Sequence, residues 1–60
     1  MPGEQRFAAV RKILESKGYR LDRISGSHHV FSKSAQQNVV IVVHGGKVMP
    51  CYVREAQKAQ

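Results

Sequence analysis

The sequence is poor in cysteine, tryptophan and acidic residues: its 60 residues include one Cys, no Trp and four Asp or Glu. A single cysteine, Cys51, cannot form an internal disulfide, which excludes a small fold cross-linked by disulfides and fits a reducing cytoplasm. The longest apolar run, from Val39 to Val43, is far shorter than the roughly 20 residues that span a bilayer. No apolar segment of the secretory type follows the N-terminus. We therefore expect a cytoplasmic protein with no membrane partner.

The charge is mostly positive: ten Lys and Arg against four Asp and Glu give a formal net charge of +6. These cations are spread along the chain, which indicates a folded basic domain rather than a basic tail. The length allows one domain, residues 1–60, with a small core. Such a surface favours nucleic acid as a partner first, acidic proteins second and an anionic membrane last.

Apolar residues at three- and four-residue spacing predict a helix from about Glu4 to Lys17. Lys17 followed by Gly18 is a typical stop, because glycine readily adopts a positive φ. A second, shorter helix is expected to begin at Pro50, which suits the first turn of a helix.

Between the helices we predict strands at residues 19–25, 28–32 and 38–43, the last being a run of β-branched residues. Ile24 breaks the alternation of the first strand and predicts a bulge or an early end of the strand there. The expected fold class is α+β, in the order α-β-β-β-α. It has a three-stranded antiparallel sheet with both helices on one face and the other face open.

Imidazole is the side chain that changes charge near neutral pH, and the sequence has three histidines. Neighbouring side chains on a strand point to opposite faces, so His28 and His29 cannot hold one metal ion without a bulge. No Cys-x-x-Cys or His-Glu-x-x-His motif is present, and we expect neither a metal site nor a cofactor. His29 shares the face of Phe31, so we expect it to be partly buried with a hydrogen-bond partner.

The open face could carry chemistry. If Phe31 pairs with Ile41, His28 lies opposite His44 on that face. One imidazole could then take the 2′-OH proton of RNA while the other protonates the leaving 5′-oxygen. In this register Lys33 and Lys47 are expected beside the histidines, where they could bind the phosphate. The simpler interpretation is that each exposed histidine is only a polar surface residue.

Three segments of the sequence resemble the HicA toxin family. Residues 11–19 end a helix with Gly-Tyr, residues 26–31 read Gly-Ser-His-His-Val-Phe after Arg23, and residues 43–47 place a histidine before Gly-Gly-Lys. The resemblance covers roughly residues 7–49. It implies a double-stranded-RNA-binding-like fold and an mRNA interferase, the toxin of a type II toxin-antitoxin pair, held inactive by a HicB-type antitoxin. The resemblance also assigns the catalytic histidine of the Gly-Ser-His motif to His28.

The sequence therefore predicts an RNA endonuclease that acts on mRNA by metal-independent acid–base cleavage. His28 is the first choice for the catalytic group and His44 the second. The candidates for binding RNA phosphates are Arg23, Ser27, Lys33 and Lys47. Two alternatives stay open: a non-catalytic RNA-binding module on the same fold, and an interaction module whose basic face docks an acidic protein.

Overall fold

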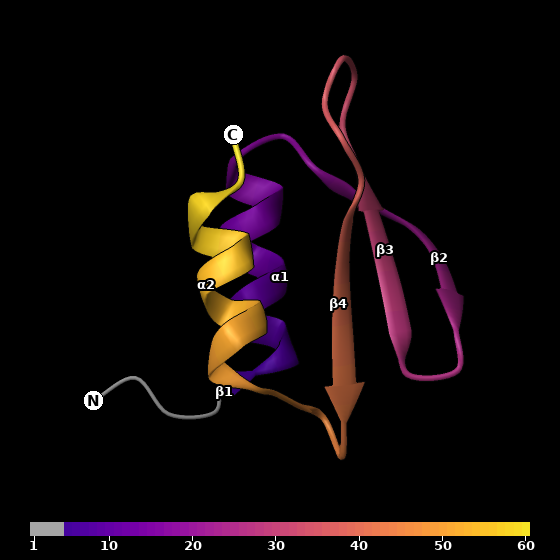
Figure 1. Cartoon of the computed structure of the whole chain (residues 1–60), viewed down its shortest axis with the longest axis vertical. Helices are drawn as coiled ribbons and strands as arrows, with labels where there is room; N and C mark the ends of the chain where they lie inside the picture. Colours follow the sequence, from indigo (N-terminus) through magenta and orange to yellow (C-terminus); the bar gives the residue numbers. More distant parts are fainter. Residues whose placement is uncertain (1–4) are drawn as a thin grey trace.

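A computed structural model describes residues 5–60 as two helices and an antiparallel sheet (Figure 1). The elements, in chain order, are β1 (Gln5–Arg6), α1 (Phe7–Ser16), β2 (Arg20–Ser25), β3 (His28–Ser32), β4 (Val39–His44), β5 (Lys47–Val48) and α2 (Pro50–Lys58). The strands lie in the order β1-β5-β4-β3-β2. The predicted α+β class is confirmed. Within residues 5–60, no helix has the length and apolar character needed to cross a membrane.

The sheet has five strands, so the prediction of three was wrong. Residues 5–6, which the apolar spacing assigned to the first helix, pair instead with residues 47–48. Strands of two residues are too short to show an alternating pattern, so they could not be predicted from the sequence. Helix α1 consequently begins at Phe7. The predicted first residue of that helix, Glu4, lies outside the described residues.

One apolar cluster joins the sheet to both helices. Its fully buried members are Val10, Leu14, Phe31, Ile41, Val48 and Ala56. These residues come from α1, α2 and the same face of β3, β4 and β5, so both helices cover one face of the sheet (Figure 1). Within residues 5–60, no helix lies on the opposite face.

Helix α1 ends where the sequence predicted. Gly18 adopts a φ of +95° and its N–H donates to the Glu15 carbonyl at 3.0 Å. The N–H of Tyr19 donates to the Leu14 carbonyl, also at 3.0 Å. These two bonds form a Schellman motif, which is normally accompanied by an apolar contact across the turn. Tyr19 and Leu14 both belong to the core cluster, so the motif fixes the point at which β2 begins.

The ends of the two helices are joined by one ammonium group. Lys17 Nζ donates to the carbonyl oxygens of Ala56 at 3.0 Å and Ala59 at 2.7 Å, and also to that of Gln57. The last carbonyls of a helix lack partners within the helix, and the helix dipole favours a cation beside them. Lys17 thus satisfies the end of α2 and ties it to the end of α1.

We expect Lys17→Met to lower the free energy of unfolding by about 1.5–3 kcal/mol, the usual contribution of hydrogen bonds to a charged group. Methionine keeps most of the apolar stem, so the lost charge dominates the effect. Urea unfolding followed by circular dichroism measures the change. Lys12→Ala, at an exposed site on α1, is the matched control and should change stability by less than about 0.5 kcal/mol. Equal stability of the two variants would contradict a structural role for Lys17.

Candidate functional site

Strand β3 places its two histidines on opposite faces of the sheet. His28 is exposed on the open face, whereas His29 is half-buried on the helix side. The His29 ring lies against Phe7, with 4.6 Å between centroids, and its Nδ1 is 3.2 Å from the carbonyl oxygen of Ser27. With the proton on Nδ1, the ring donates to that oxygen. The expectation that His29 is partly buried and hydrogen-bonded is confirmed.

The tight turn between β2 and β3 fixes His28 at the first position of β3. Gly26 takes a φ of +58°, and the Ser27 carbonyl accepts the N–H of Val43 at 2.8 Å. The turn is therefore held against β4 as well as by its own hairpin. Ser27 is half-buried, with its backbone beside His28.

A bulge in β2 brings a cation to the open face. The pairing of β2 with β3 shifts between Leu21 and Arg23, so the bulge falls two residues before the predicted position at Ile24. Beyond the shift, Arg23 pairs with Val30. Since Val30 and His28 are two residues apart on β3, Arg23 shares the face of His28 and flanks it on one side.

The predicted register between β3 and β4 was wrong by two residues. Phe31 pairs with Val39 rather than Ile41, and His28 pairs with Val42. A shift of two leaves every side chain on its original face, so the alternation of apolar residues could not distinguish the two registers. His28 and His44 still share the open face, as diagonal rather than directly opposed neighbours. The Cα atoms of diagonal neighbours lie roughly 7–8 Å apart, and their Cβ atoms are somewhat closer.

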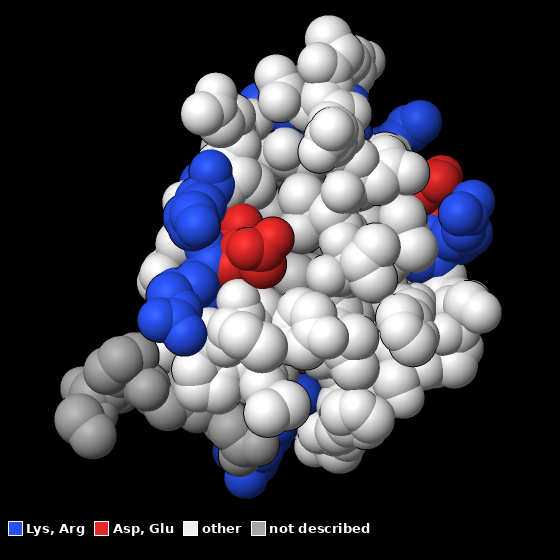
Figure 2. Space-filling view, in the orientation of Figure 1, with Lys and Arg blue, Asp and Glu red and all other residues white. Residues whose placement is uncertain are grey.

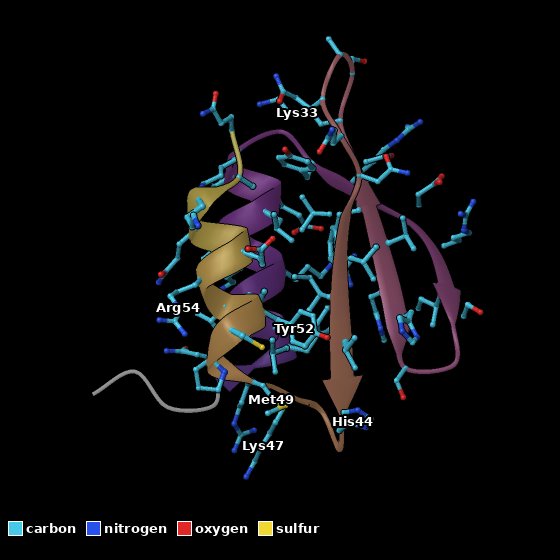
Figure 3. All side chains as sticks on the ribbon, in the orientation of Figure 1. Lys33, His44, Lys47, Met49, Tyr52 and Arg54 are labelled. Carbon is cyan, nitrogen blue, oxygen red and sulfur yellow. The ribbon has the colours of Figure 1, made fainter. Side chains whose placement is uncertain are left out.

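The turn from β4 to β5 places a lysine beside the second histidine. Gly45 and Gly46 have φ values of +57° and +76°, as a two-residue type I′ turn requires. His44 pairs directly with Lys47, and Lys47 pairs with Arg6 of β1. His44 and Lys47 therefore lie together at one end of the sheet (Figure 3). This confirms the predicted neighbourhood of Lys47.

Lys33 lies at the other end of the sheet (Figure 3). It directly follows β3, whereas His28 is the first residue of that strand, and five residues of strand span about 17 Å. The prediction that Lys33 lies beside the histidines was wrong, because it relied on loop positions without the direction of the strand. Lys33 Nζ instead donates to the Gln60 carbonyl at 2.8 Å and lies 5.5 Å from the centre of the Tyr19 ring.

The open face is bordered by cations. The strands carry four exposed basic residues whose pairing places them on this face, namely Arg6, Arg20, Arg23 and Lys47. Among the described strands the acidic residue is Asp22, in the bulge, while Glu15 and Glu55 belong to the helices. Figure 2, which looks onto α2 and β4 with the open face turned to the side, shows Lys and Arg mostly around the margin and acidic side chains among them.

Two of these cations, Arg6 and Arg20, were not among the sequence-predicted site residues. Arg20 could have been found, because it alternates with Tyr19 and Leu21 and must point away from the core. No sequence pattern indicated that Arg6 lies on the open face, because the apolar spacing placed it in a helix.

The remaining reactive groups are dispersed. Cys51 is exposed on α2. Within residues 5–60, no three side chains of the His, Cys, Asp or Glu types are grouped as a metal site would need.

The fold and this face define a small basic α+β domain with an accessible histidine on an uncovered sheet. Residues 7–56 match the family model described as the HicA toxin of bacterial toxin-antitoxin. The chain belongs to the HicA toxin family and is a toxin of the toxin-antitoxin class. No curated protein and no solved structure matches the chain significantly. The matched span includes His28, His44 and the cations on β2, the β3–β4 connection and β5.

The two adjacent histidines should differ in their contribution to stability. We expect His29→Ala to lower the free energy of unfolding by about 1–2 kcal/mol, since it removes the ring contact with Phe7 and a hydrogen bond. His28→Ala, at the next residue but exposed, should change it by less than about 0.5 kcal/mol. Urea unfolding of both variants tests this. A larger loss for His28→Ala would contradict the assignment of faces.

Proposed function

We propose that the protein is an endoribonuclease, an mRNA interferase on a double-stranded-RNA-binding-like fold, and that His28 is its catalytic group. The observation that carries this proposal is the position of His28. Its ring is exposed on the open face, with Arg23 on one side and the His44–Lys47 pair on the other. Membership of the HicA toxin family supports the same reaction class.

The proposed reaction uses a nucleophile that belongs to the RNA. One imidazole accepts the proton of the ribose 2′-OH, and the 2′-oxygen attacks the adjacent phosphorus. The bond from phosphorus to the 5′-oxygen breaks, and a second group donates a proton to that leaving oxygen. The products are a 2′,3′-cyclic phosphate and a 5′-hydroxyl, and no metal takes part.

His44 is the second group of this proposal. Diagonal neighbours, whose Cα atoms are roughly 7–8 Å apart, leave more room for a phosphate between their side chains than directly opposed residues do. Lys47 is next to His44, so its ammonium can stabilise the charge that develops on the phosphate oxygens. Arg23 supplies a planar guanidinium on the other side of His28, and the Ser27 hydroxyl is a further hydrogen-bond donor at the turn.

Two partners belong to this proposal, mRNA as the substrate and a HicB-type antitoxin as the inhibitor. The alternative is a non-catalytic RNA-binding module with the same cationic face. The two functions differ in what His28 does, so a substitution at that position separates them.

We expect His28→Ala to lower the rate of RNA cleavage by at least 10²-fold while RNA binding persists, because acid–base catalysis usually contributes 10²- to 10⁴-fold. The assay uses purified protein and a long RNA in the presence of EDTA, with binding measured by fluorescence anisotropy. His44→Ala should also slow cleavage. Lys12→Ala, on the helix side, is the control.

The alternatives predict different results from this assay. Cleavage by His28→Ala at the wild-type rate would remove His28 from the mechanism. Binding without cleavage by the wild-type protein would favour the RNA-binding module. Loss of wild-type cleavage in EDTA would contradict a metal-independent reaction.

RNA binding should weaken as salt rises, because cations that contact phosphates release counterions. For single-stranded RNA, each phosphate contact contributes about −0.7 to the slope of log K against log salt concentration. We expect Arg23→Ala and Lys47→Ala each to make the slope less steep by about 0.7, and Arg11→Ala, on α1, to leave it unchanged. Binding isotherms between 50 and 200 mM salt measure the slopes. Identical slopes for the three variants would place the RNA elsewhere.

A further inference from the structure

A second group of polar residues gathers at the end of the sheet away from His28. It surrounds an open pocket of about 530 Å³ lined by Gly18, Arg20, Ser32, Lys33 and Ser34. Arg20 and Ser32 are directly paired across β2 and β3, and Lys33 and Ser34 continue the chain from Ser32. The lining therefore combines two cations with two hydroxyls and includes no acidic side chain. This combination suits a phosphate group.

Contacts with neighbouring residues fix the position of the Lys33 side chain at this pocket. Its stem lies over Gly18, so that a Cβ at Gly18 would be 3.5 Å from Lys33 Cε. Its ammonium lies above the Tyr19 ring and donates one hydrogen bond, to the Gln60 carbonyl. An ammonium has three N–H donors, which leaves two for an anion. A side chain that is already positioned loses less entropy when a ligand binds.

Arg20 completes the pocket from the neighbouring strand. It is exposed on the open face, and Asp22, the nearest acidic residue in the chain, makes no ion pair with it. A guanidinium can grip two oxygens of one phosphate at once, which an ammonium cannot do.

Two lining residues of the pocket, Arg20 and Ser32, lie on the same face of the sheet as the histidines. Ser32 and His28 are four residues apart on β3, so they share the open face and are separated by about 14 Å. Arg23 lies between them on β2. At about 3.4 Å per stacked nucleotide, this distance corresponds to about four nucleotides.

We propose that this pocket is a second phosphate-binding site, which holds the RNA backbone about four stacked nucleotides from the cleaved bond. This proposal rests on the proposed function, since it assumes that RNA lies across the open face. It predicts that affinity depends on the length of the RNA. RNA that reaches both ends of the sheet binds more tightly than RNA that reaches only one end.

The test compares single-stranded RNA oligonucleotides of two to ten nucleotides, bound to protein carrying His28→Ala so that none is cut. Affinity in this parent should rise in a step at about four to five nucleotides. Adding Arg20→Ala should abolish the step and weaken binding of the octanucleotide about fivefold at 0.1 M salt, the effect of losing one phosphate contact. Lys33→Met, which keeps an apolar stem of similar length over Gly18, should have the same effect.

Arg54→Ala is the matched control, because it removes an exposed arginine from α2 and should leave the step intact. Circular dichroism checks that each variant is folded. An Arg20→Ala variant that keeps the step, or that weakens all lengths equally, would overturn the second site while leaving the proposed function standing. Failure of the parent and wild-type proteins to bind any of these RNAs would overturn both.

Discussion

The pairing of β3 between β2 and β4 is the constraint on which the rest of the structure depends. Its alternation sends His29 and Phe31 toward the helices and leaves His28 on the open face. A slip of one residue would exchange these faces, burying His28 and exposing the fully buried Phe31. Loss of a buried aromatic side chain from the core costs several kcal/mol, a large fraction of the stability of a domain this small. The core therefore enforces the exposure of the candidate catalytic histidine.

The same pairing gives the two ends of the sheet different characters. At one end, the glycine turns before β3 and after β4 bring His28, His44 and Lys47 together. These turns need positive φ values, which glycine adopts without strain. At the other end lie the last carbonyls of α2, and lysines gather there because those carbonyls accept hydrogen bonds and attract cations (Figure 1). An anionic chain lying across the open face would meet basic residues at both ends.

The structural features that depend on local sequence patterns could be predicted correctly from the sequence. The Schellman end of α1, the bounds of β3 and the opposite faces of His28 and His29 all follow from features within a few residues of each other. Features that depend on pairing between distant segments could not be predicted from these local patterns. The register of β3 on β4 stayed ambiguous because a shift of two preserves the apolar pattern, and the error carried over to the predicted contact between His28 and His44. The predicted position of Lys33 was wrong for a related reason. Its distance from His28 depends on the direction of β3, because the two residues lie at opposite ends of that strand.

The two lysines at the end of α2 show how hydrogen-bond donors separate a structural role from a binding role. Lys17 directs its ammonium to three carbonyls, and three is all the donors it has. An anion could be bound there only by breaking bonds that stabilise the helix end. Lys33 reaches the same region with one such bond, and it lines a pocket together with Arg20. Lys17 therefore fixes the packing of α2. Lys33 depends on that packing, and it places a positive charge at the edge of the open face.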